Sequence, residues 1–162
     1  MNMTTNTEDK TSLEITRFIN APRTRVYAAW TDPAQLKEWF GPVWVRTCEL
    51  IAEPRVGGKF RWDVINCSGK QVMIQGEYRE IIPGTKIVFT WKHCDDELWE
   101  NRISIVMVEI SDRNGGTDSR LKHEQLPGEE SRDGHSRGWN SVLDRLEYFL
   151  GRRFMNRRDE SA

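Results

Sequence analysis

Large aromatic side chains are the residues of this sequence best suited to binding chemistry. The chain has seven tryptophans among 162 residues, and several aromatics alternate with polar residues as strand faces do. Clefts lined by aromatic rings and a few polar groups bind small apolar ligands, although core packing is the commoner role of any one ring. We therefore predict a ligand-binding cavity formed by the following residues: Trp39, Phe60, Trp62, Tyr78, Phe89, Trp91, His123, Trp139 and Leu143.

His123 is the predicted polar member of this set. It has the strand parity of Thr117 and Leu121, so its ring is expected to face the same space, where a ligand carbonyl or hydroxyl can meet it. An imidazole there can bind a ligand or act as an acid or base, and it can equally be a structural residue with satisfied hydrogen bonds. Both interpretations stay open at this point.

Metal and nucleophile chemistry find less support. The segment 93–96, His-Cys-Asp-Asp, contains metal-ligand residue types, but Cys48 and Cys67 stand at no recognised zinc spacing. No serine has the flanking glycines of a nucleophile elbow. We therefore expect a polar loop at 93–96, no metal, no other cofactor and no assigned catalytic residue, which leaves enzymatic activity uncertain.

A long helix near the C-terminus must carry one side of the cavity. Between Gly134 and Gly151, apolar residues recur at the i, i+3, i+4, i+7 spacing of one helix face. Asp133 or Ser136 is the expected N-cap, and Gly151 is the expected stop. The stripe consists of Trp139, Val142, Leu143, Leu146, Phe149 and Leu150.

The remaining chain reads as strands and two short helices. A strand is expected at 13–20, where Arg17 shares the parity of the apolar residues, so the strand either bulges or turns a charge inward. Helices are expected to begin at Ala21-Pro22 and Asp32-Pro33. Further strands of an antiparallel meander are predicted at 43–52, 59–64, 72–79, 87–91, 98–110 and 117–126.

Composition restricts the partners and the organisation. Lys plus Arg number 24 and Asp plus Glu number 25, so a nucleic-acid partner is not expected. No segment approaches a membrane span. The odd count of three cysteines suggests reduced thiols in a cytoplasmic protein. The predicted organisation is a disordered leader at 1–10, a single domain at 11–151 and a polar basic tail at 152–162.

Seven segments in order resemble the family of homologues of the activator of the heat-shock protein 90 ATPase. Two of them are Arg55-Val56-Gly57-Gly58-Lys59-Phe60 and Gly76-Glu77-Tyr78-Arg79-Glu80-Ile81; the others lie within 21–33, 36–42, 83–91, 116–124 and 138–146. The resemblance implies an α+β helix-grip fold (Bet v 1/START-like), with a curved antiparallel β-sheet wrapped around a long C-terminal helix and an apolar cavity between them. Two short helices separate the first and second strands. Ser119 and Arg120 interrupt the apolar alternation and leave the register of the last strand open.

The expected function is therefore binding of a small hydrophobic or aromatic molecule in that cavity. One alternative is a co-chaperone-like interaction domain whose partner is a chaperone or another protein, acting on a heat-shock protein 90-type ATPase. Another is a cyclase or hydrolase that uses the same cavity, with His123 as its acid or base. Fold alone does not decide among these possibilities.

Overall fold

The structure is a computed structural model that describes residues 9–161, with side chains up to residue 151. Residues 1–8 of the predicted leader and the side chains of the predicted basic tail lie outside this description. The elements are β1 (Leu13–Ile19), α2 (Arg23–Thr31), α3 (Pro33–Trp39), β2 (Arg46–Ala52), β3 (Lys59–Ile65), β4 (Gln71–Ile82), β5 (Lys86–His93), the 3₁₀ turn η1 (Glu97–Trp99), β6 (Ser104–Arg113), β7 (Gly116–Glu124) and α4 (Glu129–Ser161).

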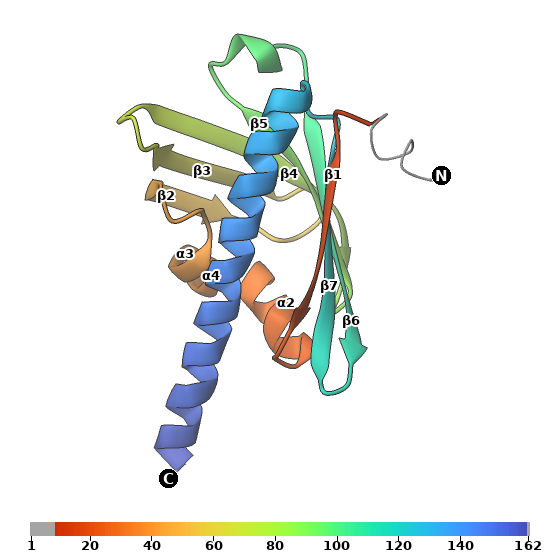
Figure 1. The fold of residues 1–162 in the computed structure, drawn as a ribbon, viewed down its shortest axis with the longest axis vertical. Coiled ribbons are helices and arrows are strands. Elements are labelled where there is room, and N and C mark those ends of the chain that lie inside the picture. The colour runs from red at the N-terminus through yellow and green to blue at the C-terminus, as the bar shows by residue number, and fades with distance from the viewer. Residues whose placement is uncertain (1–8, 162) are drawn as a thin grey trace.

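The strands form one seven-stranded antiparallel sheet in the order β1-β7-β6-β5-β4-β3-β2. Strands β2 to β7 follow one another as a meander, and β1 joins the free edge of β7. Helix α4 lies across one face of the curved sheet, with α2 and α3 beside it (Figure 1). This arrangement confirms the predicted α+β helix-grip class.

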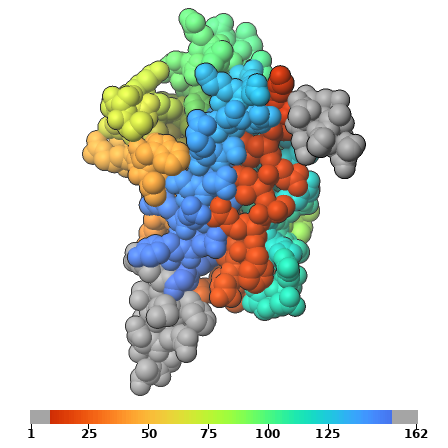
Figure 2. All heavy atoms as spheres, in the orientation of Figure 1, coloured from red at the N-terminus to blue at the C-terminus, as the bar shows by residue number. Residues whose placement is uncertain are grey.

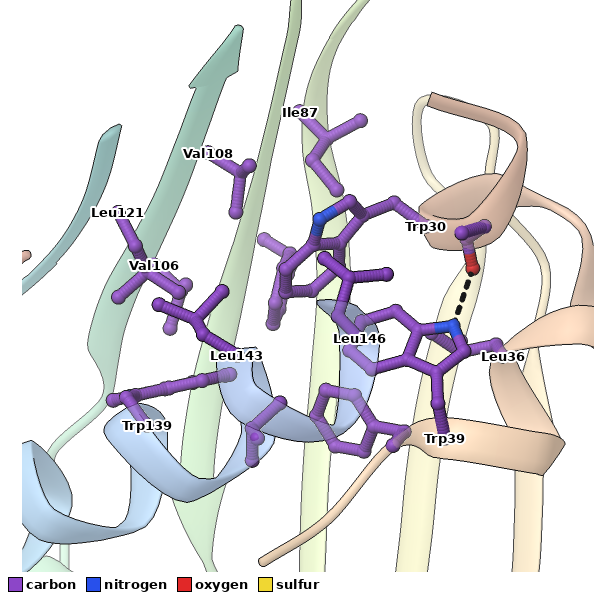
Figure 3. Close-up of a cluster of buried hydrophobic side chains, with 14 of the residues drawn as sticks. Trp30, Leu36, Trp39, Ile87, Val106, Val108, Leu121, Trp139, Leu143 and Leu146 are labelled. Carbon is purple, nitrogen blue, oxygen red and sulfur yellow. Dashed lines mark hydrogen bonds between the residues drawn. The ribbon is translucent and has the colours of Figure 1, made fainter. Parts of the chain in front are cut away.

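The predicted apolar stripe of α4 is buried along its whole length, from Trp139 to Leu150. The aromatic side chains predicted on the sheet face that meets α4 are buried as well: Phe60, Trp62, Tyr78, Phe89 and Trp91. Trp30 and Trp39 meet edge to face at 4.8 Å between ring centroids, beside Leu143 and Leu146 of the helix (Figure 3). The Trp39 indole N–H also donates to the Ala29 carbonyl at 3.0 Å, so its one polar atom is satisfied (Figure 3).

Arg17 turns its charge inward, and β1 does not bulge. The β1–β7 register runs without interruption and also settles the register of the last strand, with His123 opposite Leu13. The guanidinium of Arg17 reaches α4, where it contacts Asp144 at 2.5 Å and Glu147 at 3.0 Å. Arg17 lies on the apolar face of β1, and the two carboxylates of α4 pair with its positive charge there.

Several predicted boundaries were wrong. Strand β6 begins at Ser104 and not near residue 98, because the Asp96 carboxylate accepts the Leu98 N–H and starts the turn η1. Strand β2 begins at Arg46, after the turn at residues 43–45. Helix α4 begins at Glu129, five residues before the predicted start, so Asp133 and Ser136 are not caps.

Gly151 does not end α4, which continues to Ser161. A glycine inside a helix costs only about 1 kcal/mol and does not compel a stop. The helix also crosses the polar segment 129–137, where no apolar period marks it. Within the described residues, no helix combines the length and apolar character that crossing a membrane requires.

Candidate functional site

A cavity of about 420 Å³ lies between the N-terminal half of α4 and the sheet. It falls within the range of about 300–1,000 Å³ that is typical of small-molecule sites. The surface is hollowed between the yellow-green β3–β4 turn and the blue start of α4 (Figure 2). Its apolar wall consists of Phe40, Pro42, Trp44, Val45, Trp62, Val64, Val72, Ile74, Trp91, Trp139 and Val142, and its polar wall includes Asn66, Lys70, His93, Asp96, Ser131 and His135.

Two glycines one helical turn apart, Gly134 and Gly138, are among the six residues of α4 that line the cavity. A Cβ at Gly138 would meet nothing within 4 Å, and one at Gly134 would meet only the Arg137 side chain at 3.9 Å. Two interior glycines weaken a helix, yet neither is required here by a close approach of another segment. Their effect is to leave open space where side chains would otherwise stand.

The rim on the α3–β2 side is held in place by α4. The Val43 N–H donates to the Ser141 hydroxyl at 3.0 Å, and the Arg145 guanidinium donates to the Gly41 carbonyl at 2.8 Å. Gly41 has φ +109°, and a Cβ there would come within 2.8 Å of the Trp62 ring. The loop is thus fixed on both sides, which favours a preformed cavity.

The sequence-predicted site residues divide into two groups. Trp62, Trp91 and Trp139 lie in the cavity wall. The other six lie in the core and outside the wall: Trp39, Phe60, Tyr78, Phe89, His123 and Leu143. Phe60 stacks against Trp91 at 6.0 Å between centroids, so the core group supports the wall group from behind.

His123 is fully buried, and both of its ring nitrogens have partners inside the protein. The Trp139 indole N–H donates to Nδ1 at 3.0 Å, and Nε2 lies 2.8 Å from the Ser104 hydroxyl, which itself donates to the Trp91 carbonyl at 2.7 Å. Because an indole N–H can only donate, Nδ1 is an acceptor and Nε2 carries the proton. Burial, then the neighbouring His135 and His93, lower the pKa of His123 well below its ordinary value, so the ring is neutral.

The other two histidines, which the sequence analysis did not place in the site, meet at the cavity wall. Nε2 of His93 lies 3.1 Å from Nε2 of His135, and the Trp91 indole N–H donates to the same His135 nitrogen at 3.2 Å. The His93 ring stacks on Trp99 with centroids 4.8 Å apart. All three histidines of the chain therefore surround Trp91.

Burial keeps this pair uncharged. It lowers the pKa of His93 to about 4, an effect reinforced by His135 and opposed by the Asp96 carboxylate. Burial also lowers the pKa of His135, against the effect of its hydrogen bond to the Ser131 backbone. At neutral pH the polar part of the wall thus contains neutral imidazoles, which can each donate one hydrogen bond and accept another.

The sequence spacing of His93 and His135 indicates that both lie on the faces of the cavity tryptophans. His93 follows Trp91 by two residues on a strand and so shares its face, and His135 precedes Trp139 by four residues on one helix face. The prediction of a polar loop at 93–96 was wrong for His93, which is the last residue of β5 and therefore lies on the same strand as Trp91. Within the residues that the structure describes, no group of three or more His, Cys, Asp or Glu side chains is arranged to hold a metal ion.

The curved sheet, the gripped helix and the cavity between them define a helix-grip domain of the SRPBCC class. Residues 20–151 match the family model described as Activator of Hsp90 ATPase homolog 1-like protein, and the chain belongs to that family. Comparison with curated proteins gives no match.

Solved structures of bacterial proteins share the fold. A Chromobacterium violaceum protein is 25% identical, with a TM-score of 0.78 over 86% of this chain and 96% of that one. A Rhizobium leguminosarum protein is 27% identical, with a TM-score of 0.75 over 87% and 94%. The AHSA1 protein of Silicibacter pomeroyi is 25% identical, with a TM-score of 0.74 over 86% and 97%.

Proposed function

We propose that this protein binds a small hydrophobic or aromatic molecule in the cavity beneath the N-terminal half of α4. The observation that carries the proposal is the open, apolar space over Gly134 and Gly138, faced by the rings of Trp62, Trp91 and Trp139. A helix that merely packed on the sheet would gain stability from side chains at these two positions. The membership of the family and its helix-grip fold support the same conclusion.

A cavity-filling variant with a matched control tests the proposal. The probe is 4-methoxy-4′-nitrobiphenyl, an apolar molecule whose nitro group quenches indole fluorescence. Wild type should show saturable quenching, and Gly138→Ala should retain it, because one methyl group occupies little of a cavity of about 420 Å³. Gly138→Leu should abolish the quenching while remaining folded, since leucine has a higher helix propensity than glycine. Absence of saturable quenching in wild type, or equal affinity in Gly138→Leu, would contradict the proposal.

Acid–base catalysis by His123 is not part of this proposal. Both of its nitrogens are engaged by Trp139 and Ser104, and the ring has no accessible surface. A general acid or base must come within hydrogen-bond reach of the substrate proton, and His123 has no free atom for that contact. The cyclase or hydrolase alternative would need another group.

A protein-interaction role is the second candidate. Val43 and Trp44 are exposed by 71% and 45% at the cavity rim, and large exposed apolar residues are common at contact sites. The family description names an activator of the Hsp90 ATPase. If this chain acts in that way, it should raise the ATP turnover of a purified heat-shock protein 90, and Trp44→Ala should reduce the effect. An unchanged ATPase rate would exclude this second candidate.

A further inference from the structure

The direction of the hydrogen bonds around His93 and His135 can be deduced from their partners. Nδ1 of His135 lies 2.8 Å from the Ser131 carbonyl, which can only accept, so Nδ1 of His135 carries the proton. In the neutral ring Nε2 is then an acceptor, in agreement with the donation that it receives from the Trp91 indole. Nε2 of His135 has no proton to give, so the contact of 3.1 Å between the two Nε2 atoms is a hydrogen bond only if His93 donates, with the single lone pair of His135 Nε2 shared between His93 and Trp91.

This order leaves one acceptor unused. If His93 carries its proton on Nε2, its Nδ1 holds a lone pair, and among the described residues no group donates to it. His93 is also half-buried at the end of β5 and lies in the wall of the apolar cavity. Every other ring nitrogen of the three histidines has a partner within the protein.

The surroundings favour an uncharged donor at this nitrogen. The titratable or charged groups around His93 are His135 of α4, with His123 behind it, Asp96 before η1 and Lys70 at the rim. A neighbouring cavity, which His93 also lines, adds Arg61, Asp63, Cys94 and Asp95 on the side away from α4. The two neighbouring imidazoles are neutral, and the rest of the wall is largely apolar, so a ligand charge would lose hydration without a buried counter-charge. A neutral hydroxyl loses less on entry and gains one hydrogen bond.

We infer that the cavity selects apolar aromatic ligands that carry a hydroxyl group, and that this hydroxyl donates to Nδ1 of His93. The inference rests on the proposed binding function and names the chemical class of its ligand. The aromatic body lies among Trp62, Trp91 and Trp139. His93 is the residue that determines specificity, and Trp99 and His135 hold its ring in place by stacking and by the Nε2 hydrogen bond.

A pair of probes that differ in one group tests this inference. At about pH 6.5 a phenolic hydroxyl, with an ordinary pKa of about 10, and His93 are both neutral. Wild type should bind 4-hydroxy-4′-nitrobiphenyl about tenfold or more tightly than its methyl ether, because the bound ether covers the Nδ1 acceptor without supplying a donor. His93→Phe keeps the ring on Trp99 and should lower the affinity for the hydroxyl probe to that for the ether, with the ether unchanged.

Two further arms keep the test decisive. Lys70→Met should still prefer the hydroxyl probe over the ether. If Lys70→Met loses this preference while His93→Phe keeps it, the probe binds as a phenolate paired with Lys70, and the inference is overturned. If His93→Phe does not fold, the imidazole ¹⁵N NMR signals of wild type are measured with and without the hydroxyl probe. The hydroxyl probe should move the Nδ1 signal of His93 and leave both His123 signals in place, and an unmoved Nδ1 signal would overturn the inference.

The possible failures are separable. Equal affinity of wild type for the hydroxyl probe and the ether overturns the hydroxyl inference and leaves apolar binding intact. Absence of saturable binding of either probe overturns both the inference and the proposed function.

Discussion

The two halves of the α4 face that meets the sheet differ in what they carry. The C-terminal half presents Leu143, Leu146 and Leu150, each at most 2% exposed. Leu143 and Leu146 lie beside Trp30 and Trp39 (Figure 3). The N-terminal half presents glycine at 134 and 138, and a cavity lies beneath it. The same helix and sheet thus form a close-packed core at one end and enclose a cavity at the other. The two glycines leave space at one end that leucine side chains fill at the other.

The histidines repeat this contrast on a smaller scale. His123 has its hydrogen bonds completed by the core, whereas His93 retains an unused acceptor at the cavity. A polar group with all partners in the protein stabilises the fold, and one with a missing partner is available to a ligand.

The largest expected effect lies in the closed half. Leu146→Ala should lower the free energy of unfolding by about 2–5 kcal/mol, through lost apolar burial and the hole left behind. Urea unfolding measures it. Leu98→Ala, at a side chain that is 67% exposed, is the matched control and should change the free energy by at most about 0.5 kcal/mol. Similar values for both variants would mean that the closed half is not close-packed.

Acid should weaken the protein through the histidines. The pKa of His93 is about 4 in the folded state against 6.5 for the ordinary side chain, so the unfolded chain binds the proton more readily. Stability is therefore full above about pH 6.5 and falls as the pH drops toward 4, by about 2 kcal/mol for His93 between pH 7 and 4.5. The same urea series on His93→Phe should show a correspondingly shallower decline, and an equally steep one would contradict the buried neutral assignment.

The core histidine should matter for stability and not for binding. His123→Phe leaves the Trp139 indole N–H without its acceptor, which costs about 1–3 kcal/mol in a buried site. The affinity for 4-methoxy-4′-nitrobiphenyl should stay within about twofold of wild type, a change of less than about 0.5 kcal/mol. A loss of binding without a loss of stability would reverse the roles that we assign to His123 and His93.

The smallest expected effect is a change in stability when glycine is replaced at residue 138. Gly138→Ala should raise the free energy of unfolding by about 0.5–1 kcal/mol, because its Cβ enters open space and alanine favours the helix. Gly76→Ala is the opposite case, since its Cβ would lie 1.9 Å from the Thr90 carbonyl oxygen, and it should destabilise the protein. Destabilisation by Gly138→Ala would show that the space over residue 138 is filled.

The sequence predicted the sheet faces and the buried stripe of α4 because periodicity reports burial directly, as at Trp62, Trp91 and Leu146. It placed the start of α4 too late, because the turn from Glu129 to Asp133 has no apolar residue to mark it. Leu98 and Trp99 resembled strand residues, although a local Asp96 cap makes them a 3₁₀ turn.

The candidate site was harder to predict than the fold. Periodicity gives the face of His93 and His135 but not the 3.1 Å contact between them, which depends on how α4 crosses β5. Nor does it distinguish an aromatic that lines a cavity, such as Trp91, from one that fills the core, such as Phe89. That difference depends on the residues opposite each ring, and those opposite Trp91 include residues of α4 such as Gly138 that are far away in the sequence.

The indole signals of the tryptophans in a ¹H–¹⁵N NMR titration test the central claim most directly. With 4-methoxy-4′-nitrobiphenyl, the account predicts saturable shifts at Trp62, Trp91 and Trp139 and an unmoved signal at Trp39, whose N–H is bound to Ala29 in the closed half. Shifts at Trp39 equal to those at Trp91, or no saturable shift at Trp62, Trp91 and Trp139, three of the four tryptophans in the cavity wall, would contradict it.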